Sequence, residues 1–332
     1  MHPSIRQATP QDIPGIVELL LTDAADRQTV DAVLWKMGKD AAADIHAALT
    51  FALTSDKQPF QQIWHVAEHE GAITGVVHSM LLPVPPIYAG SKGEPGLILP
   101  DAFVAPGAAH TTAKALIEAA EQALRDAGAQ IILTSLVTSE TWQDVFDERG
   151  YAPLTLYLSR TGLAGAERPA NIRSATQADI SGIVARSAEH RQVLFDIDPF
   201  WETHVDADTR FAAWMTRSLS LPDRDMMVLG PPDSLGGYVI AQPASRLHFP
   251  PAHDIGGTGV IDDYFHTDFA DVETLAHSGD GAIALLHAAE AAFVARGIDA
   301  VFVVCPAAWH SKIELLKMAG YETAMVWSIK RD

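Results

Sequence analysis

The amino-acid sequence repeats itself about halfway along its 332 residues. The run at 5–17, IRQATPQDIPGIV, can be laid without a gap over the run at 172–184, IRSATQADISGIV, at an offset of 172 − 5 = 167. We name the segment that begins with the first run copy one, and the segment that begins with the second run copy two.

The match extends to the ends of both copies. The Gly150-Tyr151 pair lies over Gly320-Tyr321, at an offset of 320 − 150 = 170. The triplet Ala-Ala-Glu at 119–121 lies over the same triplet at 288–290, at an offset of 288 − 119 = 169. Offsets that drift by so little across a whole domain are hard to obtain by chance, so the sequence predicts one domain written twice.

The length and composition agree with two domains. A chain of 332 residues suits two domains of about 150 residues each. Hydrophobic residues make up 48% of the chain and charged residues 20%, so each copy has enough apolar side chains for a core. We predict copy one at 1–160, a linker rich in Gly, Ala and Pro at 161–171, and copy two at 172–332.

Both copies show the same order of predicted elements: a strand, helical regions, a hairpin, a further strand, a long amphipathic helix, an apolar strand, a short helix and a last strand that closes the domain. The further strand is predicted at 97–104 in copy one and at 259–265 in copy two, and the last strands at 155–158 and 324–329. This order predicts an α/β (α+β) fold, with a mixed, mostly antiparallel central sheet in each copy and helices on its faces.

The charge of the chain narrows the kinds of partner. There are 42 acidic residues against 23 basic ones, which gives a formal net charge of -19. Nucleic acid or an anionic membrane would require a basic patch, so neither is expected as a partner. The acidic balance is compatible with a cationic substrate such as an amine, or simply with a solubilising surface.

Cysteine usage and the N-terminus bear on the compartment. Cys305 is the only cysteine, so no intramolecular disulfide forms, and a lone thiol fits a reducing compartment. The residues at 1–6 do not begin a secretory signal, and no apolar run approaches the roughly 20 residues that cross a bilayer. We expect a soluble, cytoplasmic protein.

Three segments resemble the GNAT superfamily of acyl-CoA-dependent N-acyltransferases. The opening Ile-Arg-x-Ala-Thr-x-x-Asp-Ile resembles the family's first strand and helix. The run FVAP at 103–106, followed by ALIEAA at 115–120, resembles its central strand and coenzyme-binding helix. The run IELLKMAGY at 313–321 resembles its last helix. With the order of elements, these segments identify the chain as similar to a tandem-duplicated member.

The resemblance implies an activity and a co-substrate. Acetyl-CoA or another acyl-CoA would donate its acyl group directly to a small-molecule amine in a ternary complex, with no metal. The pyrophosphate would lie at the N-terminus of the long helix, where free backbone N–H groups bind anions. Two diverging central strands would hold the pantetheine arm, and a base would remove a proton from the amine.

The phosphate loop departs from the family pattern Arg/Gln-x-x-Gly-x-Gly/Ala in both copies. Copy one has Ala109, Thr112 and Lys114 at those positions, and none matches. Copy two has His277, Asp280 and Ala282, with glycines on both sides of Asp280, so we predict copy two as the likelier acyl-CoA site and copy one as degenerate. The predicted coenzyme-binding residues are Phe265, His277, Ser278, Gly279, Asp280, Gly281, Ala282 and His310.

The predicted base lies on the central strand of copy two. Asp262 and Asp263 are adjacent there, and copy one has Asp101 in the equivalent stretch. Adjacent residues of a strand point to opposite faces, so at most one of the pair is expected to face the cleft. The alternative is that both are ordinary strand-end acids. Many family members use a Tyr in the last helix as general acid, but the matching positions are Phe146 and Leu316.

Other residues have competing interpretations. A nucleophilic Cys305–His310 pair is less expected than a packed core cysteine, because the cysteine ends an apolar strand. No spacing typical of a metal site occurs. Four aromatic residues of the helical regions are equally compatible with a substrate pocket and with core: Trp35, Phe200, Trp201 and Trp214.

Two functions therefore remain from the sequence. The first is an N-acyltransferase in which Asp262 or Asp263 is the base and copy one packs against copy two like half of a dimer. The alternative is a non-catalytic acyl-CoA-binding or regulatory protein, which the eroded loops and the absent tyrosines favour. The chain could be a monomer or a homodimer, because the tandem already forms a pseudo-dimer.

Overall fold

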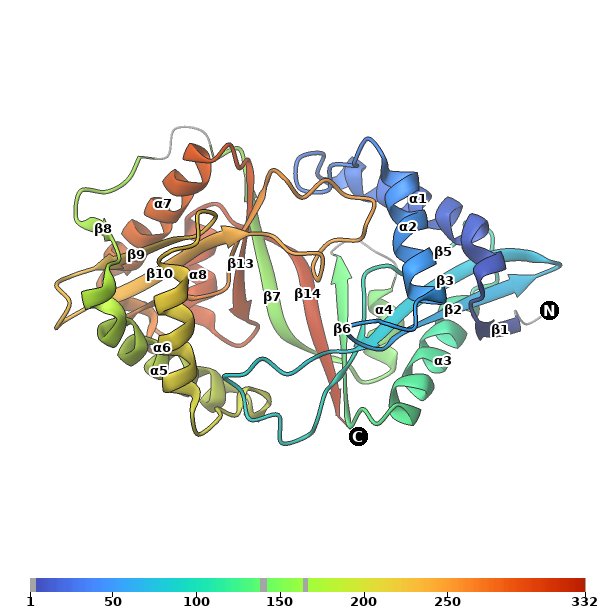
Figure 1. Cartoon of the computed structure of the whole chain (residues 1–332), viewed down its shortest axis with the longest axis horizontal. Helices are drawn as coiled ribbons and strands as arrows, with labels where there is room; N and C mark the ends of the chain where they lie inside the picture. Colours follow the sequence, from blue (N-terminus) through green and yellow to red (C-terminus); the bar gives the residue numbers. More distant parts are fainter. Residues whose placement is uncertain (1–3, 138–141, 164–166, 332) are drawn as a thin grey trace.

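The computed structural model describes residues 4–137, 142–163 and 167–331. Figure 1 shows the two copies side by side, with the N-terminus at the outer end of copy one and the C-terminus near the middle. Copy one contains β1 (Ser4–Gln7), α1 (Ile13–Val30), α2 (Ala41–Thr54), β2 (Gln62–His69), β3 (Ala72–Leu81), β4 (Gly96–Ile98), β5 (Phe103–Val104), α3 (Thr112–Asp126), β6 (Ile131–Val137), α4 (Gln143–Glu148) and β7 (Ala152–Thr161).

Copy two repeats this order without a gap in the series. It contains β8 (Ile172–Ser174), α5 (Ile180–Ile197), α6 (Ala207–Ser218), β9 (Asp225–Leu229), β10 (Gly237–Pro243), β11 (Thr258–Ile261), β12 (Tyr264–His266), α7 (Asp280–Ala295), β13 (Ala300–Pro306), α8 (His310–Met318) and β14 (Glu322–Arg331). Short 3-10 turns begin α1 and α5 and lie between β12 and α7. The predicted linker includes 164–166, which lie outside the described residues.

The repeated opening motif forms the same ion pair in both copies. In copy one, Arg6 donates both terminal nitrogens to the carboxylate of Asp12, at 2.7 Å each. Asp12 also accepts from the N–H and the hydroxyl of Thr9 at the start of the first helical turn. Arg173 and Asp179 repeat the arrangement in copy two. The identical letters in the two runs are therefore explained by one capping cluster that joins the first strand to the first helix.

This cluster predicts how stability responds to acid. The hydrogen bonds from Arg6 and Arg173 lower the pKa of Asp12 and of Asp179 to about 2, from 3.8. A carboxyl with a lowered folded-state pKa stabilises the protein above its unfolded pKa and loses that contribution as the pH falls through the folded value. Each aspartate should contribute on the order of 2 kcal/mol at pH 7. Asp12→Asn and Asp179→Asn should lower the urea midpoint at pH 7, and the difference from wild type should shrink between pH 4 and pH 2. A deficit that persists unchanged to pH 2 would contradict this prediction.

The predicted hairpin is confirmed, whereas the prediction of one continuous central strand in each copy is wrong. β2 and β3 are antiparallel and turn at Glu70-Gly71, where both residues have positive φ. The strand predicted at 97–104 is two pieces, β4 and β5, and the strand predicted at 259–265 is likewise β11 and β12. The reason is that each first piece pairs with the following parallel strand, whereas each second piece pairs only with the preceding hairpin.

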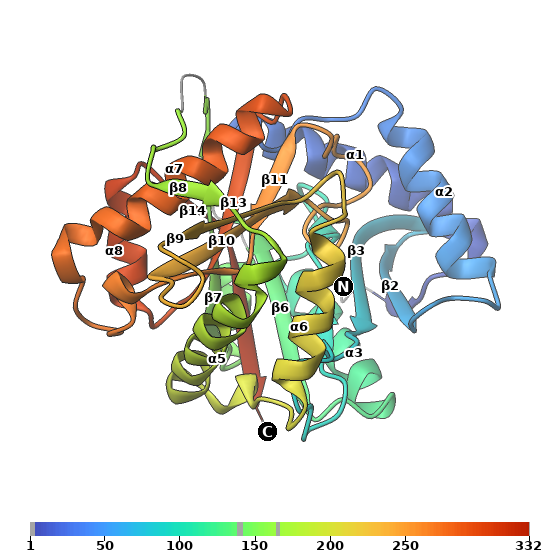
Figure 2. The ribbon, with the colours of Figure 1, turned by 60° about the vertical axis from the view of Figure 1, so that its left-hand side comes forward.

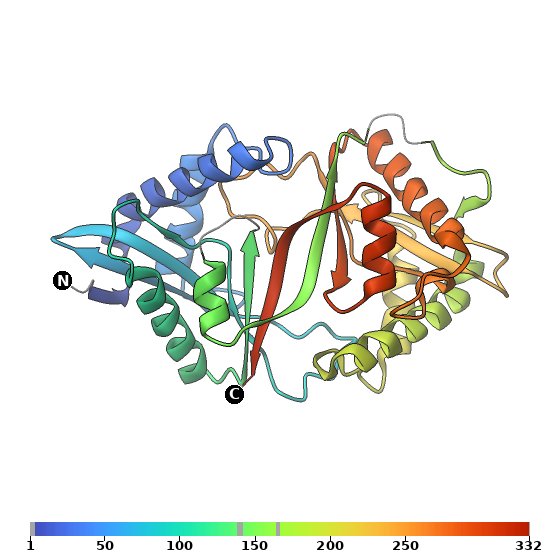
Figure 3. The ribbon, with the colours of Figure 1, turned by 180° about the vertical axis from the view of Figure 1, so that it is seen from behind.

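Helices cover both faces of the sheet in each copy. In copy one, α1 and α2 pack on the face that carries Trp64, Val66 and Val76, and α3 packs on the opposite face with Ala67 and Val77. Figure 3 shows α4 and α8 together on the face that is turned away in Figure 1. None of the helices in the described part of the chain is long and apolar enough to cross a membrane.

The last strands of the two copies are exchanged. The sheet is continuous through both copies, in the order β1-β2-β3-β4-β6-β14-β7-β13-β11-β10-β9-β8. β14 of copy two lies between β6 and β7 of copy one, and β7 lies between β14 and β13 of copy two (Figures 1 and 2). The expectation that each last strand closes its own domain is therefore wrong. Because the copies share a fold, each last strand finds an equivalent place in the other copy.

Partly buried ion pairs connect each exchanged strand to the long helix of the other copy. Lys330 of β14 donates to Glu121 of α3 at 3.0 Å, and Arg160 of β7 donates to Glu290 of α7 at 2.9 Å. The same two glutamates accept from the hydroxyls of the tyrosines in the two Gly-Tyr pairs, at 3.1 and 2.8 Å. The repeated Ala-Ala-Glu and Gly-Tyr motifs thus meet each other in space. Each motif pair receives a cation from the other copy.

A second reciprocal contact joins the loop before each central strand to the other copy. The N–H of Ala89 donates to the carbonyl of Glu202 at 2.7 Å, and the N–H of His204 donates to the carbonyl of Ile87 at 2.9 Å. The N–H groups of Gly38 and Asp254 make the equivalent pair of bonds, both 2.8 Å, with Ala252 and Lys36. In each copy, the loop before the central strand therefore packs against the other copy, next to the first two helices of that other copy.

Candidate functional site

The central strands diverge in both copies, as the resemblance implied. In copy two, β11 and β13 pair in parallel from Thr258/Ala300 to Ile261/Val303. Beyond that point β12 pairs only with β10, while β13 continues along β7 to Pro306. In copy one, β4 and β6 separate after Ile98 in the same way. A gap between the strands therefore begins next to the N-terminus of the long helix in each copy.

The N-terminus of α7 in copy two is already occupied by a carboxylate. Asp268, which is 4% exposed, accepts from the N–H of Gly281 at 2.9 Å and of Ala282 at 3.2 Å. His277 also contacts this carboxylate, at 3.2 Å. These are the backbone groups that we predicted would bind a pyrophosphate. An internal anion takes their place, and its negative charge would repel a phosphate, so the geometry does not support copy two as the likelier acyl-CoA site.

The glycines of this loop serve packing between protein groups. A Cβ added to Gly281 would lie 2.4 Å from Cε1 of His266, and a Cβ added to Gly279 would lie 2.7 Å from Leu315. Gly279 also has a φ of 71°, and His277 and Ser278 share the left-handed region at 50° and 54°. The sequence suggested that these glycines allow a phosphate to approach the backbone. In the structure they allow the loop to close on itself.

The gap between the strands of copy two is filled as well. Lys312 of α8 is fully buried, and its Nζ donates to the carbonyl of Tyr264 at 3.0 Å. That carbonyl faces the gap, because the preceding carbonyl, of Asp263, accepts from Ile240 of β10. The ammonium also lies 5.2 Å from the ring centroids of Tyr264 and Trp309. The backbone acceptor that a pantetheine arm would use is thus bonded to a lysine.

The remaining predicted coenzyme contacts are engaged elsewhere. Phe265 is fully buried and packs against His190, Phe269 and Trp309. His310 is exposed at the start of α8 and pairs with Glu273 at 2.8 Å. Asp280 lies in the first turn of α7. Phe265 and His310 are therefore held by contacts with other side chains of copy two.

Copy one differs at the equivalent helix. At the start of α3, the N–H groups of Ala113 and Lys114 donate to no acceptor within the part of the chain that the structure describes. His110 and Lys114 are exposed beside them, and the hydroxyl of Thr112 is buried without a partner. Two open N–H groups next to a lysine fit a phosphate, although no side chain matches the family pattern. The copy that the sequence marked as degenerate thus has the open helix terminus.

Asp262 and Asp263 border a cavity of about 230 Å³ on the face of copy two that α5 covers. Its lining comes from both copies: Pro85, Ile87, Tyr88, Thr155, Ser187, His190, Arg191, Leu194, Trp201, Asp262, Asp263, Val304 and Pro306. The expectation that at most one of the two aspartates faces the cleft is wrong. Both line the cavity because the strand is interrupted between β11 and β12, where alternation does not apply.

The two carboxyls are held in unlike ways. Gln242 donates to Asp262 at 2.8 Å, and the hydroxyl of Tyr238 donates to Asp263 at 3.3 Å. Enclosure by the protein raises the pKa of Asp263 to about 7, and the neighbouring charge of Asp262 raises it further than the bond from Tyr238 lowers it. A carboxyl that titrates near neutrality can accept or release a proton under physiological conditions.

Copy one contains a buried His–Asp pair that the sequence did not reveal. Nδ1 of His78, on β3, lies 3.2 Å from the carboxylate of Asp101, and the two residues are 6% and 4% exposed. Because the carboxylate only accepts, it fixes the ring hydrogen on Nδ1 and leaves Nε2 as the acceptor. Nε2 has no partner among the described atoms, and Trp64 stacks on the ring at 3.9 Å. The two residues are 23 positions apart, so no local motif could have signalled the pair.

Other residues that the sequence singled out have structural roles. Cys305 is buried, and burial raises the pKa of its thiol to about 12, which rules out a reactive thiolate near neutral pH. Trp201 lines the cavity of copy two, whereas Trp35 is core. Trp214 is 42% exposed beneath the guanidinium of Arg224. Among the residues placed by the structure, no group of three His, Cys, Asp or Glu could hold a metal ion.

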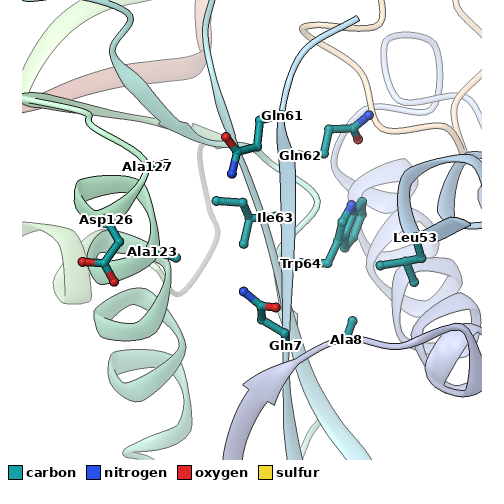
Figure 4. A pocket seen from close by; sticks show the side chains of 10 residues that line it. All are labelled: Gln7, Ala8, Leu53, Gln61, Gln62, Ile63, Trp64, Ala123, Asp126 and Ala127. Atoms are coloured by element: carbon teal, nitrogen blue, oxygen red, sulfur yellow. The ribbon is translucent and has the colours of Figure 1, made fainter. Parts of the chain in front are cut away.

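A second cavity, of about 430 Å³, lies at the other end of the sheet in copy one (Figure 4). It is bordered by the start of β2, the end of α2 and the end of α3, with Gln61, Trp64 and Asp126 among its walls. The strands diverge next to the beginning of α3, so this cavity adds no group to the candidate coenzyme site.

Two solved structures resemble the chain over nearly its full length. The tandem GNAT protein from the clavulanic acid biosynthesis pathway, without acetyl-CoA, is 13% identical, with 99% of this chain and 98% of that chain covered and a TM-score of 0.52. A GCN5-related N-acetyltransferase from Sphaerobacter thermophilus is 15% identical, with 99% and 95% covered and a TM-score of 0.55. No protein-family model matches the chain, and no curated protein matches its sequence. The chain therefore has the fold of a tandem GNAT protein.

Proposed function

We propose that this protein is an acyl-CoA-dependent N-acyltransferase that binds its coenzyme in copy one and acts on a small-molecule amine. The observation that carries the proposal is the contrast between the two long helices. The first N–H groups of α3 are open beside Lys114, whereas those of α7 are bonded to Asp268. The tandem GNAT fold supports the reaction class, and the difference between the helices supports the choice of copy.

The residues of copy one suit the two tasks that the reaction requires. The N–H groups of Ala113 and Lys114, with the Lys114 ammonium, would hold the pyrophosphate. The bound coenzyme supplies an acyl group activated as a thioester. Nε2 of His78, which is enclosed in this structure, would take a proton from the ammonium of the acceptor once the side chains around it open, and Asp101 would orient the ring and stabilise its charged form. Neither copy carries the usual tyrosine, so the thiolate would leave without a general acid.

The test is a calorimetric titration of acetyl-CoA into the whole protein. We expect saturation near one equivalent per chain. Lys114→Glu should weaken binding at least about tenfold, because it replaces a cation with an anion beside the phosphates, and Lys114→Gln should weaken it less. His310→Glu, which introduces an acid at the start of α8 among the coenzyme contacts first predicted in copy two, should leave the affinity unchanged. Loss of binding with His310→Glu and not with Lys114→Glu would place the coenzyme in copy two and overturn the proposal.

A non-catalytic acyl-CoA-binding protein is the second candidate. The filled gap and capped helix of copy two, with Phe146 and Leu316 at the tyrosine positions, favour it. Turnover separates the two functions. Asp101→Asn should lower the acylation rate of any accepted amine while leaving acetyl-CoA affinity unchanged, because it acts on the base alone. Binding without turnover across a broad panel of amines would instead support the second candidate.

A further inference from the structure

The cavity of copy two is built by both copies and does not depend on the coenzyme. Pro85, Ile87 and Tyr88 of copy one form one wall, and this segment is fixed to copy two by the backbone bonds of Ala89 and His204. Arg210 of copy two adds a bond to the carbonyl of Pro86 at 2.8 Å. A molecule in this cavity would contact both copies at once.

The polar groups of the cavity select a cation. Asp262 and Asp263 lie side by side at its border, and a neutral side chain donates a hydrogen bond to each, with backbone N–H groups also donating to Asp262. Arg191, the nearest cation on α5, is already paired with Asp208 and bonded to Ser187. The one cation among the lining residues, Arg191, is paired outside the cavity, so two adjacent carboxyls favour a positively charged guest.

A buried donor adds a second requirement. Arg191 lines the cavity and is 3% exposed, and its Nε donates to no acceptor among the described atoms. Buried N–H groups of native proteins are nearly always bonded to protein, water or ligand. This nitrogen is itself enclosed, so an oxygen on the guest would bond to it after a small shift of the Arg191 side chain. The rest of the lining is mostly aliphatic or aromatic, including Leu194, Trp201 and Val304, and suits a short apolar body.

The opposite side of the same strand is closed to a coenzyme. Lys312 occupies the gap beside Tyr264, and Asp268 occupies the helix terminus. A guest at Asp263 would therefore find no thioester to react with.

We propose that the cavity of copy two is a non-catalytic binding site for a small primary amine that carries an oxygen acceptor and a short apolar body, such as an amino acid or an amino alcohol. The two carboxyls bind the ammonium, Arg191 binds the oxygen, and the 85–88 segment of copy one closes over the apolar part. The bound molecule then stabilises the contact between the copies.

Binding should depend on pH, since Asp263 titrates near neutrality. The neighbouring residue Asp262 lies with it between β11 and β12. The other charged and titratable groups around Asp263 are Tyr238 on β10, Arg191 and the buried, neutral His190 on α5, Lys312 on α8, Tyr88 of copy one, and Arg224 toward Asp262. A cation favours the ionised form of Asp263, so affinity should rise between pH 6 and pH 8, where the ligand amine stays protonated.

The experiment is a calorimetric titration of the whole protein at pH 8 with leucinol, the amine 3-methylbutylamine and its neutral isostere 3-methylbutanol. Leucinol and 3-methylbutylamine should bind at one equivalent per chain, with leucinol tighter and 3-methylbutanol at least tenfold weaker. Asp263→Asn and Tyr88→Ala should each weaken leucinol binding at least tenfold, and the exposed Asp233→Asn should leave it unchanged. An unliganded melting temperature equal to that of wild type verifies that each variant is folded.

Three results would overturn the proposal. The first is equal affinity for the amine and the alcohol, and the second is unchanged binding in Asp263→Asn. The third is acylation of bound leucinol by acetyl-CoA that disappears in Asp263→Asn, which would make the site catalytic. Lys114→Glu should leave leucinol binding intact, so failure of the coenzyme proposal for copy one and failure of this site are distinguishable.

Discussion

Fragments comprising residues 1–166 and 167–332 should each fail to fold as monomers, and should form a folded one-to-one complex when refolded together. Both neighbours of β7 in the sheet, β13 and β14, belong to copy two, and both neighbours of β14 belong to copy one. A fragment alone therefore lacks both of the strands that flank its last strand in the intact sheet. An isolated strand in water lacks the burial and hydrogen bonds that offset its conformational entropy.

Size and cooperativity would test this expectation. Light scattering and urea unfolding of each fragment should show aggregation or an expanded chain without a cooperative transition, and the mixture should recover both the mass and the transition of the intact protein. As a control, cleavage of the folded protein at a protease site inserted between Leu163 and Glu167 should leave the two pieces associated. A fragment that is monomeric and unfolds cooperatively would contradict this prediction and would indicate that its last strand can take the equivalent place in its own copy.

Glu121→Gln should destabilise the protein by about 3 kcal/mol at pH 7, because it removes a buried anion from two partly buried cations, Arg149 and Lys330. Glu121 is 1% exposed and accepts from Arg149 at 2.7 and 2.9 Å, from Lys330 at 3.0 Å and from Tyr151 at 3.1 Å. Burial alone would raise its pKa, but the bonds and charges of Arg149 and Lys330 outweigh burial and lower it to about 2. The destabilisation should therefore be complete above about pH 4.5 and shrink as the pH falls toward 2.

Glu118→Gln is the matched control. Glu118 lies one turn earlier on α3 and pairs with the same arginine at 2.8 Å, but its side chain is 51% exposed. An exposed pair of this kind contributes below about 1 kcal/mol. Urea denaturation of the two variants should separate their free energies of unfolding clearly. Equal losses would indicate that the charge cluster around Glu121 is no more than a surface network.

Much of the fold could be predicted because its signals lie within short stretches of the sequence and occur in both copies. The Arg6–Thr9–Asp12 cluster and the Glu70-Gly71 turn each lie within a few residues, so their pattern in the sequence is enough. The identity of the partner of β7 is not local. Both last strands carry similar apolar patterns, and nothing within either strand tells whether its neighbour comes from the same copy. The domain boundaries, read from the repeat, stay a prediction.

The candidate site was harder to predict, because its character depends on contacts between distant positions. Comparing the phosphate loops letter by letter favoured copy two, since Gly279 and Gly281 fit an anion loop. Asp268 lies well upstream of that loop, and only the turn between β12 and α7 brings its carboxylate to the helix. The cavity at Asp263 could be anticipated from two acids on a central strand. Its second wall, at Tyr88, comes from a loop of the other copy.

The exchange of β7 and β14 also means that the sheet cannot close until almost the whole chain has been synthesised. When β7 leaves the ribosome at Thr161, about 170 further residues must be made before Arg331 completes β14 (331 − 161 = 170). At 5–20 residues per second, the edges of β6 and β7 wait unpaired for about 10 to 30 s. Exposed strand edges of this kind are templates for wrong pairing between nascent chains. The yield of folded protein in the cell should consequently depend on chaperones and on translation speed more strongly than that of a protein whose sheets close in the order in which they are made.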